Sequence, residues 1–347
     1  MAKTSVAIIG ATGETGHFII DALLDKKSAH GLQKITAIAR PSSATNQKYT
    51  DLRSRGIKVI AVELTGPEDA LVEALANIDV VISTVSVASF KDQILLAKAA
   101  KKAGVKRFVP SEFAMVIPPK GVHDLQDMKT DVLNEIKRLH LPWTVINVGW
   151  WYAGFLPRLA SGRTDYIRPA ALFPEQNFVP GDGEAVCSMI DSRDVGRYVA
   201  RIVQDPRTLN KQVLASNFAP KLNELFGLME EISGEKIKKT YVSEPIFPNC
   251  AYVMTDVFSQ LSAKDIEGQI QQSREKIAAG QSDYMTQVGL MMSQYQYSAG
   301  RHDNTPEYAE YLGYLLTTDL YPDFKQITYR EFFQEVLDGK ARAAYSE

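Results

Sequence analysis

Three glycines at three-residue spacing, Gly10, Gly13 and Gly16, lie near the start of this chain. Glycines in this pattern allow a tight turn, a close approach of the backbone to a phosphate, and close packing of a helix on a strand. The N–H groups at a helix N-terminus attract anionic oxygens. The pattern therefore predicts a dinucleotide-phosphate site, with a purely structural turn as the alternative. The residues assigned to this site are Gly10, Thr12, Gly13, Glu14, Thr15 and Gly16.

The residue that follows the second apolar run, 35–39, indicates which dinucleotide fits. An NAD site carries an acid about 20 residues beyond the glycines, where it binds the ribose hydroxyls. This chain has Arg40 there, followed by Ser42 and Lys48. Cations and hydroxyls suit a 2′-phosphate, so we expect NADPH/NADP+ as the cofactor. A solvated arginine at a strand end is the alternative.

One lysine, Lys129, falls within an apolar stripe. Leu125, Val132 and Ile136 define that stripe at helical spacing, and Lys129 lies between them. A lysine on an inward face must reach solvent, find a partner or have a lowered pKa, and a lowered pKa suits general acid–base catalysis near neutral pH. The spacing leaves a catalytic lysine and a solvent-reaching lysine both open.

Other catalytic patterns are poorly supported by the sequence. The five histidines show no metal-binding spacing, so no metal is expected. The Tyr-x-x-x-Lys pair of many short-chain reductases is absent, because Leu125 and Gln126 occupy the positions four and three residues before Lys129. Ser111 lacks the flanking glycines of a nucleophile elbow. Hydride transfer assisted by a lone lysine is the hypothesis that these residues favour.

Short apolar runs alternate with helical patterns through the first 150 residues. Such alternation predicts an α/β fold of the Rossmann type, a doubly wound parallel sheet covered on both faces. The strands are expected at 6–9, 35–39, 58–62, 79–83, 107–109 and 143–147, and the helices at 17–24, 46–55, 68–76, 90–103 and 125–139.

Ligands of such a sheet bind beyond the carboxyl ends of its strands. The residues found there, and assigned to cofactor binding together with Lys129, are Thr84, Val85, Ser86, Ser111, Glu112, Phe113, Val148 and Gly149. An ordinary loop that caps the next helix is the alternative for each of them.

The pattern loosens beyond residue 150, where prolines interrupt the chain. We expect a cofactor-binding domain over 1–155 and a smaller, irregular α/β substrate region over 156–347, some segments of which return to the sheet. Phe113, Trp150, Trp151 and Tyr152 should stand near the cofactor end of the sheet. Aromatic walls suit a flat or aromatic substrate, although packing at a two-domain junction would use the same residues.

Composition limits the classes of partner. The chain has 347 residues, a net charge of −2 and two cysteines, and its pI is near 6.3. A chain this close to neutral is not expected to bind nucleic acid or an anionic membrane. With two cysteines, no membrane-length apolar run and no leader, we expect a soluble, cytoplasmic monomer or homodimer that binds a small-molecule substrate.

The order of these motifs resembles the isoflavone reductase-like group, atypical short-chain reductases related to phenylcoumaran benzylic ether and pinoresinol reductases and to the NmrA-like regulators. The segments that carry the resemblance are GATGETG, ARPS, VVISTV, KRFVPSEF, QDMKTDV, IDSRDVGRYVARIVQDPRTLNK, KTYVSE and DLYPDFK. The resemblance implies an NADPH-bound Rossmann domain, a small substrate domain, and a catalytic acid or base at the position of Lys129.

Two departures limit what the resemblance implies. Plant members have an Asn-Cys-Phe type of sequence where this chain has Gly149, Trp150, Trp151 and Tyr152, and residues 259–303 match poorly. We therefore expect an NADPH-dependent reductase of an aromatic or polyketide-like molecule, without assuming a plant substrate. The alternative is a non-catalytic, NmrA-like protein that senses the redox state of NADP(H).

Overall fold

A parallel sheet forms the centre of the molecule. The computed structural model describes residues 4–25, 32–168, 177–180, 182–242, 263–280, 290, 294, 298 and 301–343. Five strands pair in the order β3-β2-β1-β4-β5, and each pair is parallel. Their bounds are β1 Thr4–Ile9, β2 Leu32–Ala39, β3 Lys58–Ala61, β4 Val80–Ser83 and β5 Arg107–Val109.

Strands from later in the chain extend this sheet beyond β5. A parallel bridge between Phe108 and Trp143 joins β5 to the start of β6, and β6, β10 and β12 pair in parallel. Their bounds are β6 Thr144–Asn147, β10 Lys211–Leu214 and β12 Leu315–Leu316. Segments beyond residue 155 thus belong to the sheet, and the domain boundary at 155 and 156 stays a prediction.

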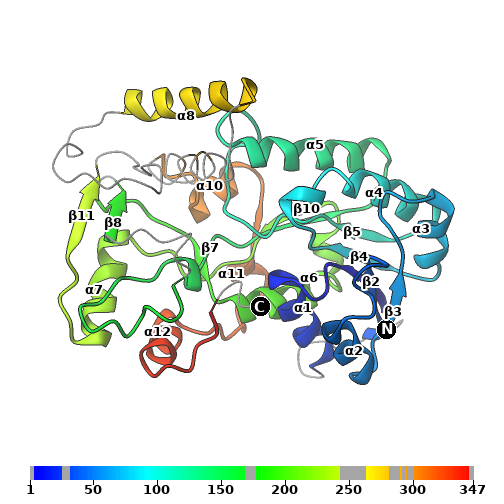
Figure 1. Ribbon diagram of the computed structural model, residues 1–347, viewed down its shortest axis with the longest axis horizontal. Helices are drawn as coiled ribbons and strands as arrows, with labels where there is room; N and C mark the ends of the chain where they lie inside the picture. Colours follow the sequence, from blue (N-terminus) through cyan, green and yellow to red (C-terminus); the bar gives the residue numbers. More distant parts are fainter. Residues whose placement is uncertain are drawn as a thin grey trace.

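Helices cover both faces of the sheet (Figure 1). Side chains alternate along β1, so that Val6 and Ile8 enter one core while Ala7 and Ile9 enter the other. The first core includes α1, α2 and α6, and the second includes α3, α4 and α5. Their bounds are α1 Glu14–Leu24, α2 Gln47–Ser54, α3 Glu68–Ala74, α4 Gln93–Lys102, α5 Asp124–Arg138 and α6 Ser192–Ile202. The α/β Rossmann-type fold predicted from the sequence is confirmed.

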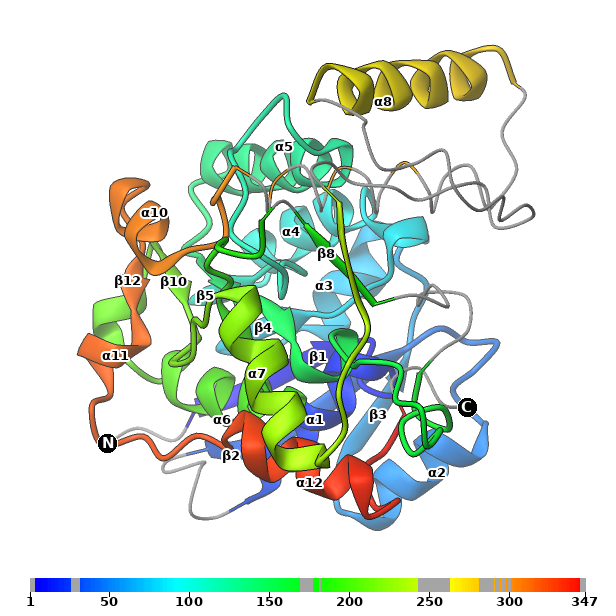
Figure 2. The same ribbon diagram turned by 90° about the vertical axis from the view of Figure 1, so that its left-hand side faces the viewer.

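A third core holds together the region that packs beside this sandwich (Figure 2). It is built mainly from α7, α12 and the segment 152–167. Two short parallel strand pairs, β7 with β9 and β8 with β11, complete the region. The bounds of these and the remaining elements are β7 Trp150–Trp151, β8 Asn177–Pro180, β9 Met189–Ile190, β11 Lys239–Val242, α7 Leu222–Ser233, α8 Ala263–Ala278, α10 Pro306–Tyr311, α11 Thr317–Leu320 and α12 Tyr329–Leu337, with short 3-10 turns at Val87–Ser89, Tyr152–Gly154 and Pro206–Thr208.

Predicted and observed boundaries of the first 150 residues agree within a few residues. The largest shifts are of three residues: the helix expected from 17 begins at Glu14, the strand expected from 35 begins at Leu32, and the helix expected from 90 begins at Gln93, after a 3-10 turn. Residues 259–303, which match the family poorly, lie only partly within the described residues, where α8 forms over Ala263–Ala278.

The described residues contain neither a candidate membrane span nor a candidate metal cluster. No helix in them is both long enough and apolar enough to cross a bilayer. They also contain no cluster of three or more His, Cys, Asp or Glu side chains placed to hold a metal ion. Cys187 is buried, which raises the pKa of its thiol to about 12, and Cys250 lies outside the described residues.

Candidate active site

The glycine turn between β1 and α1 is closely packed. Gly10 has φ +80°, a left-handed conformation, and a Cβ there would lie 2.5 Å from the carbonyl oxygen of Thr84. A Cβ on Gly16 would lie 2.1 Å from the carbonyl oxygen of Gly10. Both positions therefore require glycine for the turn itself and for the packing of α1 on β1.

Gly13 differs from the other two glycines. Its backbone, with φ −78° and ψ 177°, suits any residue, and a Cβ would meet only the Gly10 carbonyl oxygen, at 3.2 Å. It is the N-cap of α1 and offers no side chain to cap the helix. The first-turn N–H groups of α1 are therefore available to an anion, and the missing Cβ leaves room for it.

A pocket of about 600 Å³ opens beside this turn, at the carboxyl ends of β2, β1 and β4. Eight predicted cofactor residues line it: Gly10, Thr12, Gly13, Arg40, Lys48, Thr84, Val85 and Ser86. The other lining residues are Ile9, Ile38, Ala39, Ser43, Asn46, Gln47, Tyr49, Val62, Leu64 and Ser89. Glycines, hydroxyls and two cations thus meet around one cavity, as a dinucleotide with an extra phosphate requires.

The turn after β2 places a different serine in the pocket from the one predicted. Ser43 lines it and Ser42 does not. The N–H groups of Ser43 and Ala44 both donate to the carbonyl oxygen of Arg40, which curls the chain toward α2. Asn46 caps α2 by accepting from the Tyr49 N–H, at 3.1 Å. Asparagine before a helical pattern is a cap signal that could have located this turn from the sequence.

The loops after β4 and β5 are tied to each other. The Thr84 hydroxyl donates to the carbonyl oxygens of Ile9 and Gly10, at 2.8 and 3.0 Å. The Ser111 hydroxyl donates to the carbonyl oxygen of Val85 at 3.0 Å, and its N–H donates to the buried Gln93 side chain. These contacts fix the rim of the sheet between the pocket and the end of β6.

Lys129 lies on the buried side of α5. Its side chain is 5% exposed, so the solvent-reaching alternative is wrong. Its Nζ donates to the carbonyl oxygen of Glu112 at 2.7 Å and lies 3.9 Å from Oε1 of the same residue. Burial lowers the pKa of the Lys129 ammonium, and the Glu112 carboxylate opposes that shift.

The peptide between Glu112 and Phe113 is held from both sides. The Phe113 N–H donates to the carbonyl oxygen of Ile146 in β6, at 3.0 Å. In a trans peptide the C=O points the opposite way, which here is toward Lys129 Nζ. Phe113 has φ +29°, a strained conformation that costs roughly 1–3 kcal/mol. The loop is therefore held in a conformation in which the Glu112 carbonyl oxygen points toward Lys129.

The remaining residues predicted beyond β6 have structural contacts. Val148 is fully buried, and its N–H donates to the carbonyl oxygen of Ala114. Gly149 has φ +70°, and a Cβ there would lie 2.1 Å from the carbonyl oxygen of Ser188. Asn147, which the sequence reading missed, donates from Nδ2 to the Met115 carbonyl oxygen at 2.8 Å. This end of β6 thus supports the loop that carries Glu112.

The four aromatic residues predicted for the substrate separate in the structure. Tyr152 is 1% exposed, and its ring packs against Tyr329 and Phe332 in the third core. Trp150 also packs against the third core, whereas Trp151 and Phe113 pack with the first. The structure encloses the Tyr152 ring in the third core, and the partly exposed tryptophans lie at the junction of two cores.

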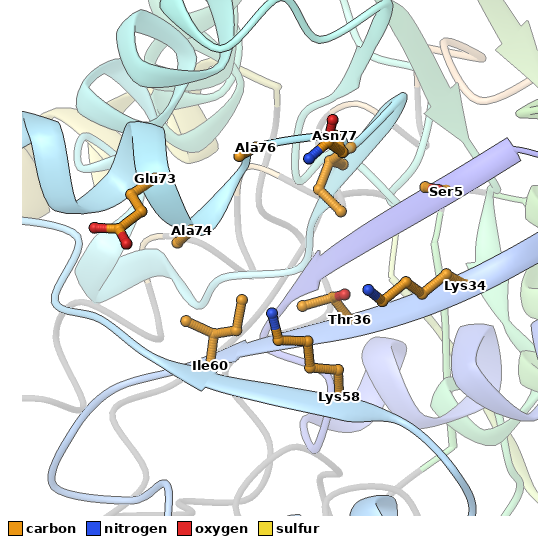
Figure 3. A pocket seen from close by; sticks show the side chains of 10 residues that line it. Ser5, Lys34, Thr36, Lys58, Ile60, Glu73, Ala74, Ala76 and Asn77 are labelled. Atoms are coloured by element: carbon orange, nitrogen blue, oxygen red, sulfur yellow. The ribbon is translucent and has the colours of Figure 1, made fainter.

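A second pocket, of about 500 Å³, lies away from these residues (Figure 3). Figure 3 shows Lys34 and Lys58 extending from β2 and β3, with Glu73 of α3 across from them. It includes Ser5 near the start of β1, and no predicted site residue lines it. Its position toward the amino ends of the strands is not where doubly wound sheets bind their ligands.

His123 adjoins the lysine at the start of α5. It is 1% exposed, and its Nδ1 accepts from the Leu125 N–H at 3.2 Å. Burial, and next to it the charge of Lys129, lower the pKa of His123 to about 4. The next residue, Asp124, pairs with Arg274 of α8 and donates its N–H to Gln294. Figures 1 and 2 both show one end of α8 near α5, with the rest of α8 extending away from it.

His123 should make the free energy of unfolding depend on pH. Between pH 6.5 and about 4 the unfolded chain protonates this histidine while the folded protein does not. The contribution of His123 to the free energy of unfolding is therefore complete above pH 6.5. As the pH falls toward 4, about 3 kcal/mol of that free energy is lost. His123→Asn keeps a capping acceptor and removes the titration. Urea unfolding at each pH should give a flatter curve for the variant, and parallel curves would contradict the assigned shift.

Comparison with known proteins places the chain in a family. The sequence profile described as the NmrA-like family matches residues 2–286. Asnovolin J 5′,6′-dehydrogenase of Aspergillus novofumigatus is 41% identical over 336 residues, which cover 96% of this chain and 96% of that protein. Phenylcoumaran benzylic ether reductase TP7 of Nicotiana tabacum is 31% identical over 257 residues, covering 70% of this chain and 79% of the relative.

Solved structures agree on the fold. The binary complex of leucoanthocyanidin reductase with NADPH, from Vitis vinifera, superposes with a TM-score of 0.72 at 23% identity. The superposition covers 96% of this chain and 99% of the other. The resemblance stated from the sequence segments is therefore confirmed at the level of family and fold.

Proposed function

This chain belongs to the NmrA-like family, and we propose that it is an oxidoreductase that uses NADPH to reduce a small organic molecule, with Lys129 as the general acid or base. The observation that carries the proposal is the burial of Lys129 beside the loop that follows β5, in a sheet whose other strand ends line a pocket of about 600 Å³. A lysine held out of water, with its Nζ fixed by one carbonyl oxygen, has the placement that proton transfer requires.

The residues of the pocket fit NADPH. The N-terminus of α1 and the space at Gly13 would hold the pyrophosphate, and Arg40 and Lys48 would pair with the 2′-phosphate. Thr84, Val85 and Ser86 would lie along the ribose and phosphates. The cofactor, when bound, supplies the hydride; the protein supplies orientation and a proton.

Lys129 would act on the substrate atom that gains or loses a proton. Its Nζ donates one hydrogen to the Glu112 carbonyl oxygen, so the amine has further hydrogens to offer a substrate oxygen. In reduction the ammonium protonates that oxygen or a neighbouring atom, and in the reverse direction the amine removes the proton. One residue therefore serves a reductase and a dehydrogenase equally.

The substrate class is proposed from the relatives and from the junction aromatics. The relatives found include a dehydrogenase of asnovolin J and a phenylcoumaran benzylic ether reductase. We propose an aromatic or polyketide-like molecule of secondary metabolism, bound near Phe113, Trp150 and Trp151. Tyr152 is left out of this set because its ring is enclosed in the third core.

Replacement of Arg40 tests the choice of cofactor. Arg40→Asp removes a charge-assisted bond to the 2′-phosphate and adds like-charge repulsion, so NADPH binding should weaken by about 2 kcal/mol or more. NADH, which lacks that phosphate, should lose much less. Arg53→Asp is the matched control, because Arg53 is exposed on α2 and does not line the pocket. Calorimetric titration that shows equal losses for both cofactors would refute the 2′-phosphate assignment.

A redox sensor is the alternative that the same pocket permits. A sensor should bind NADP+ and NADPH with different affinities and should oxidise neither in the presence of any substrate. The buried lysine favours the enzyme, because a sensor has no use for a desolvated amine. Screening of NADPH oxidation with aryl ketones, enones and benzylic ethers separates the two.

A further inference from the structure

Glu112 is buried next to Lys129, and its carboxyl group is poorly hydrogen-bonded. Its side chain is 6% exposed, and Oε1 has no hydrogen-bond partner among the described residues. A buried carboxyl oxygen without a hydrogen bond is costly to retain. The nearest cation is Lys129 Nζ, 3.9 Å away. The two side chains thus form a buried pair that lacks a direct hydrogen bond between carboxylate and ammonium.

The backbone brings the two groups together. Glu112 follows β5 by three residues, and Lys129 lies in the second turn of α5, which connects β5 to β6. The Glu112 carbonyl oxygen already holds Lys129 Nζ at 2.7 Å, so the carboxyl group of the same residue cannot move far from the amine. The Phe113 N–H bond to Ile146 fixes this peptide from the other side. The separation of the pair is therefore set by the loop and the helix.

The other titratable groups around the pair are uncharged near neutral pH. His123, at the N-terminus of α5, has its pKa lowered to about 4 and is neutral there. Tyr314, before β12, is buried close to Glu112, and burial raises the pKa of its phenol well above the ordinary value. The ring of Phe90 lies 5.8 Å from Lys129 Nζ. Of the described residues, Glu112 is the charged group that acts on the lysine.

We propose that Glu112 is a positioning residue that holds Lys129 as an ammonium ion, so that Lys129 enters the reaction as the proton donor. The inference rests on the proposed function for its catalytic meaning. The physical reason is that burial removes the water that would stabilise the ammonium, and a carboxylate within 4 Å replaces part of that stabilisation. Glu112 transfers no proton itself and does not contact the substrate.

The direct test is the titration of Lys129 in the intact protein, without substrate or cofactor. The Cε resonance of isotope-labelled lysine reports the protonation of each amine, and the resonance missing from Lys129→Met identifies this one. Glu112→Gln keeps the shape and removes the charge, so the midpoint of Lys129 should fall by about one pH unit or more. Glu112→Asp moves the carboxylate back by one methylene group. The Lys129 midpoint in that variant should therefore lie between the midpoints in the parent protein and in Glu112→Gln.

A control variant and a second Glu112 variant make this test decisive. Glu135→Gln, on the same helix but six residues away from Lys129, should leave the midpoint in place. If Glu112→Gln does not fold, the Glu112→Asp midpoint decides, because it must still lie below that of the parent. A midpoint that stays unchanged or rises in the folded Glu112 variants overturns the inference.

A thermal measurement provides an independent readout. Glu112→Gln should lower Tm more in the parent protein than in Lys129→Met, because only the parent is left with a buried, unpaired ammonium. Equal losses in the two backgrounds would contradict the pairing. Neither measurement uses turnover, so a protein that reduces no substrate would refute the proposed function and leave this inference standing.

Discussion

Lys129→Met should lower turnover by about 10²–10⁴-fold while leaving NADPH affinity nearly unchanged. Methionine retains the length and volume of the lysine stem but can neither donate nor accept a proton. The phosphates and adenine would be held at the pocket formed by the ends of β2, β1 and β4, which Lys129 does not line. Steady-state kinetics and calorimetric titration of the same preparation separate the two effects.

Lys137→Met is the matched control for this variant. Lys137 lies on the same helix but is exposed, and its amine rests over the Trp143 ring at 4.9 Å. The control makes the same chemical change outside the buried stripe, so its turnover should match that of the parent. A Lys129→Met enzyme that retains most of its kcat would leave Lys129 as a packing residue.

Gly13→Val should weaken NADPH binding by about 100-fold or more, equivalent to roughly 2.7 kcal/mol. The branched side chain would occupy the space where a pyrophosphate approaches the N-terminus of α1. The backbone at Gly13 accepts any residue, and among the described residues a Cβ there would meet only the Gly10 carbonyl oxygen, at 3.2 Å. The variant should therefore fold, as circular dichroism would show.

Gly13→Ala and Gly10→Val are the comparison variants for Gly13→Val. Alanine adds one methyl group and should give an intermediate loss of affinity. Gly10→Val should instead destabilise the fold, since Gly10 has φ +80° and a Cβ would lie 2.5 Å from the Thr84 carbonyl oxygen. If folded Gly13→Val bound NADPH as tightly as the parent, the turn would be structural only.

The inward position of Lys129 could be predicted from the sequence because helical periodicity is local information. Leu125, Val132 and Ile136 lie four, three and seven residues from Lys129, and Val132, Ile136 and Lys129 itself are buried in the structure. The glycine turn was predictable for the same reason, since its constraints come from residues within one strand, one turn and one helix.

The Glu112 pair could not be predicted in this way. Glu112 and Lys129 are 17 residues apart, and their contact depends on how α5 packs and on a strained peptide at Phe113 that no propensity encodes. The sequence assigned Glu112 to the cofactor because it follows a strand. The structure shows that Glu112 also contacts Lys129. This contact can be recognised only when the packing of the loop against α5 is known.

The aromatic residues after β6 show a different limit. Adjacent residues of a strand face opposite sides, and a two-residue strand is too short for its pattern to indicate which side is buried. Tyr152 follows Trp151 directly and turns into the third core because α12 supplies Tyr329 and Phe332 from far along the chain. A reading of neighbouring residues cannot supply that partner.

Hydride transfer itself is the central claim, and isotope transfer measures it most directly. The protein is incubated with NADPH deuterated at both C4 positions and with aryl ketones, enones and benzylic ethers, and the products are examined by mass spectrometry. The reverse reaction is followed as NADP+ reduction by the corresponding reduced compounds. We predict a product that carries one deuterium per NADPH oxidised, formed much more slowly by Lys129→Met. Intact NADPH with every compound, no reduction of NADP+, and different affinities for the two cofactor forms would contradict the account and identify a redox sensor.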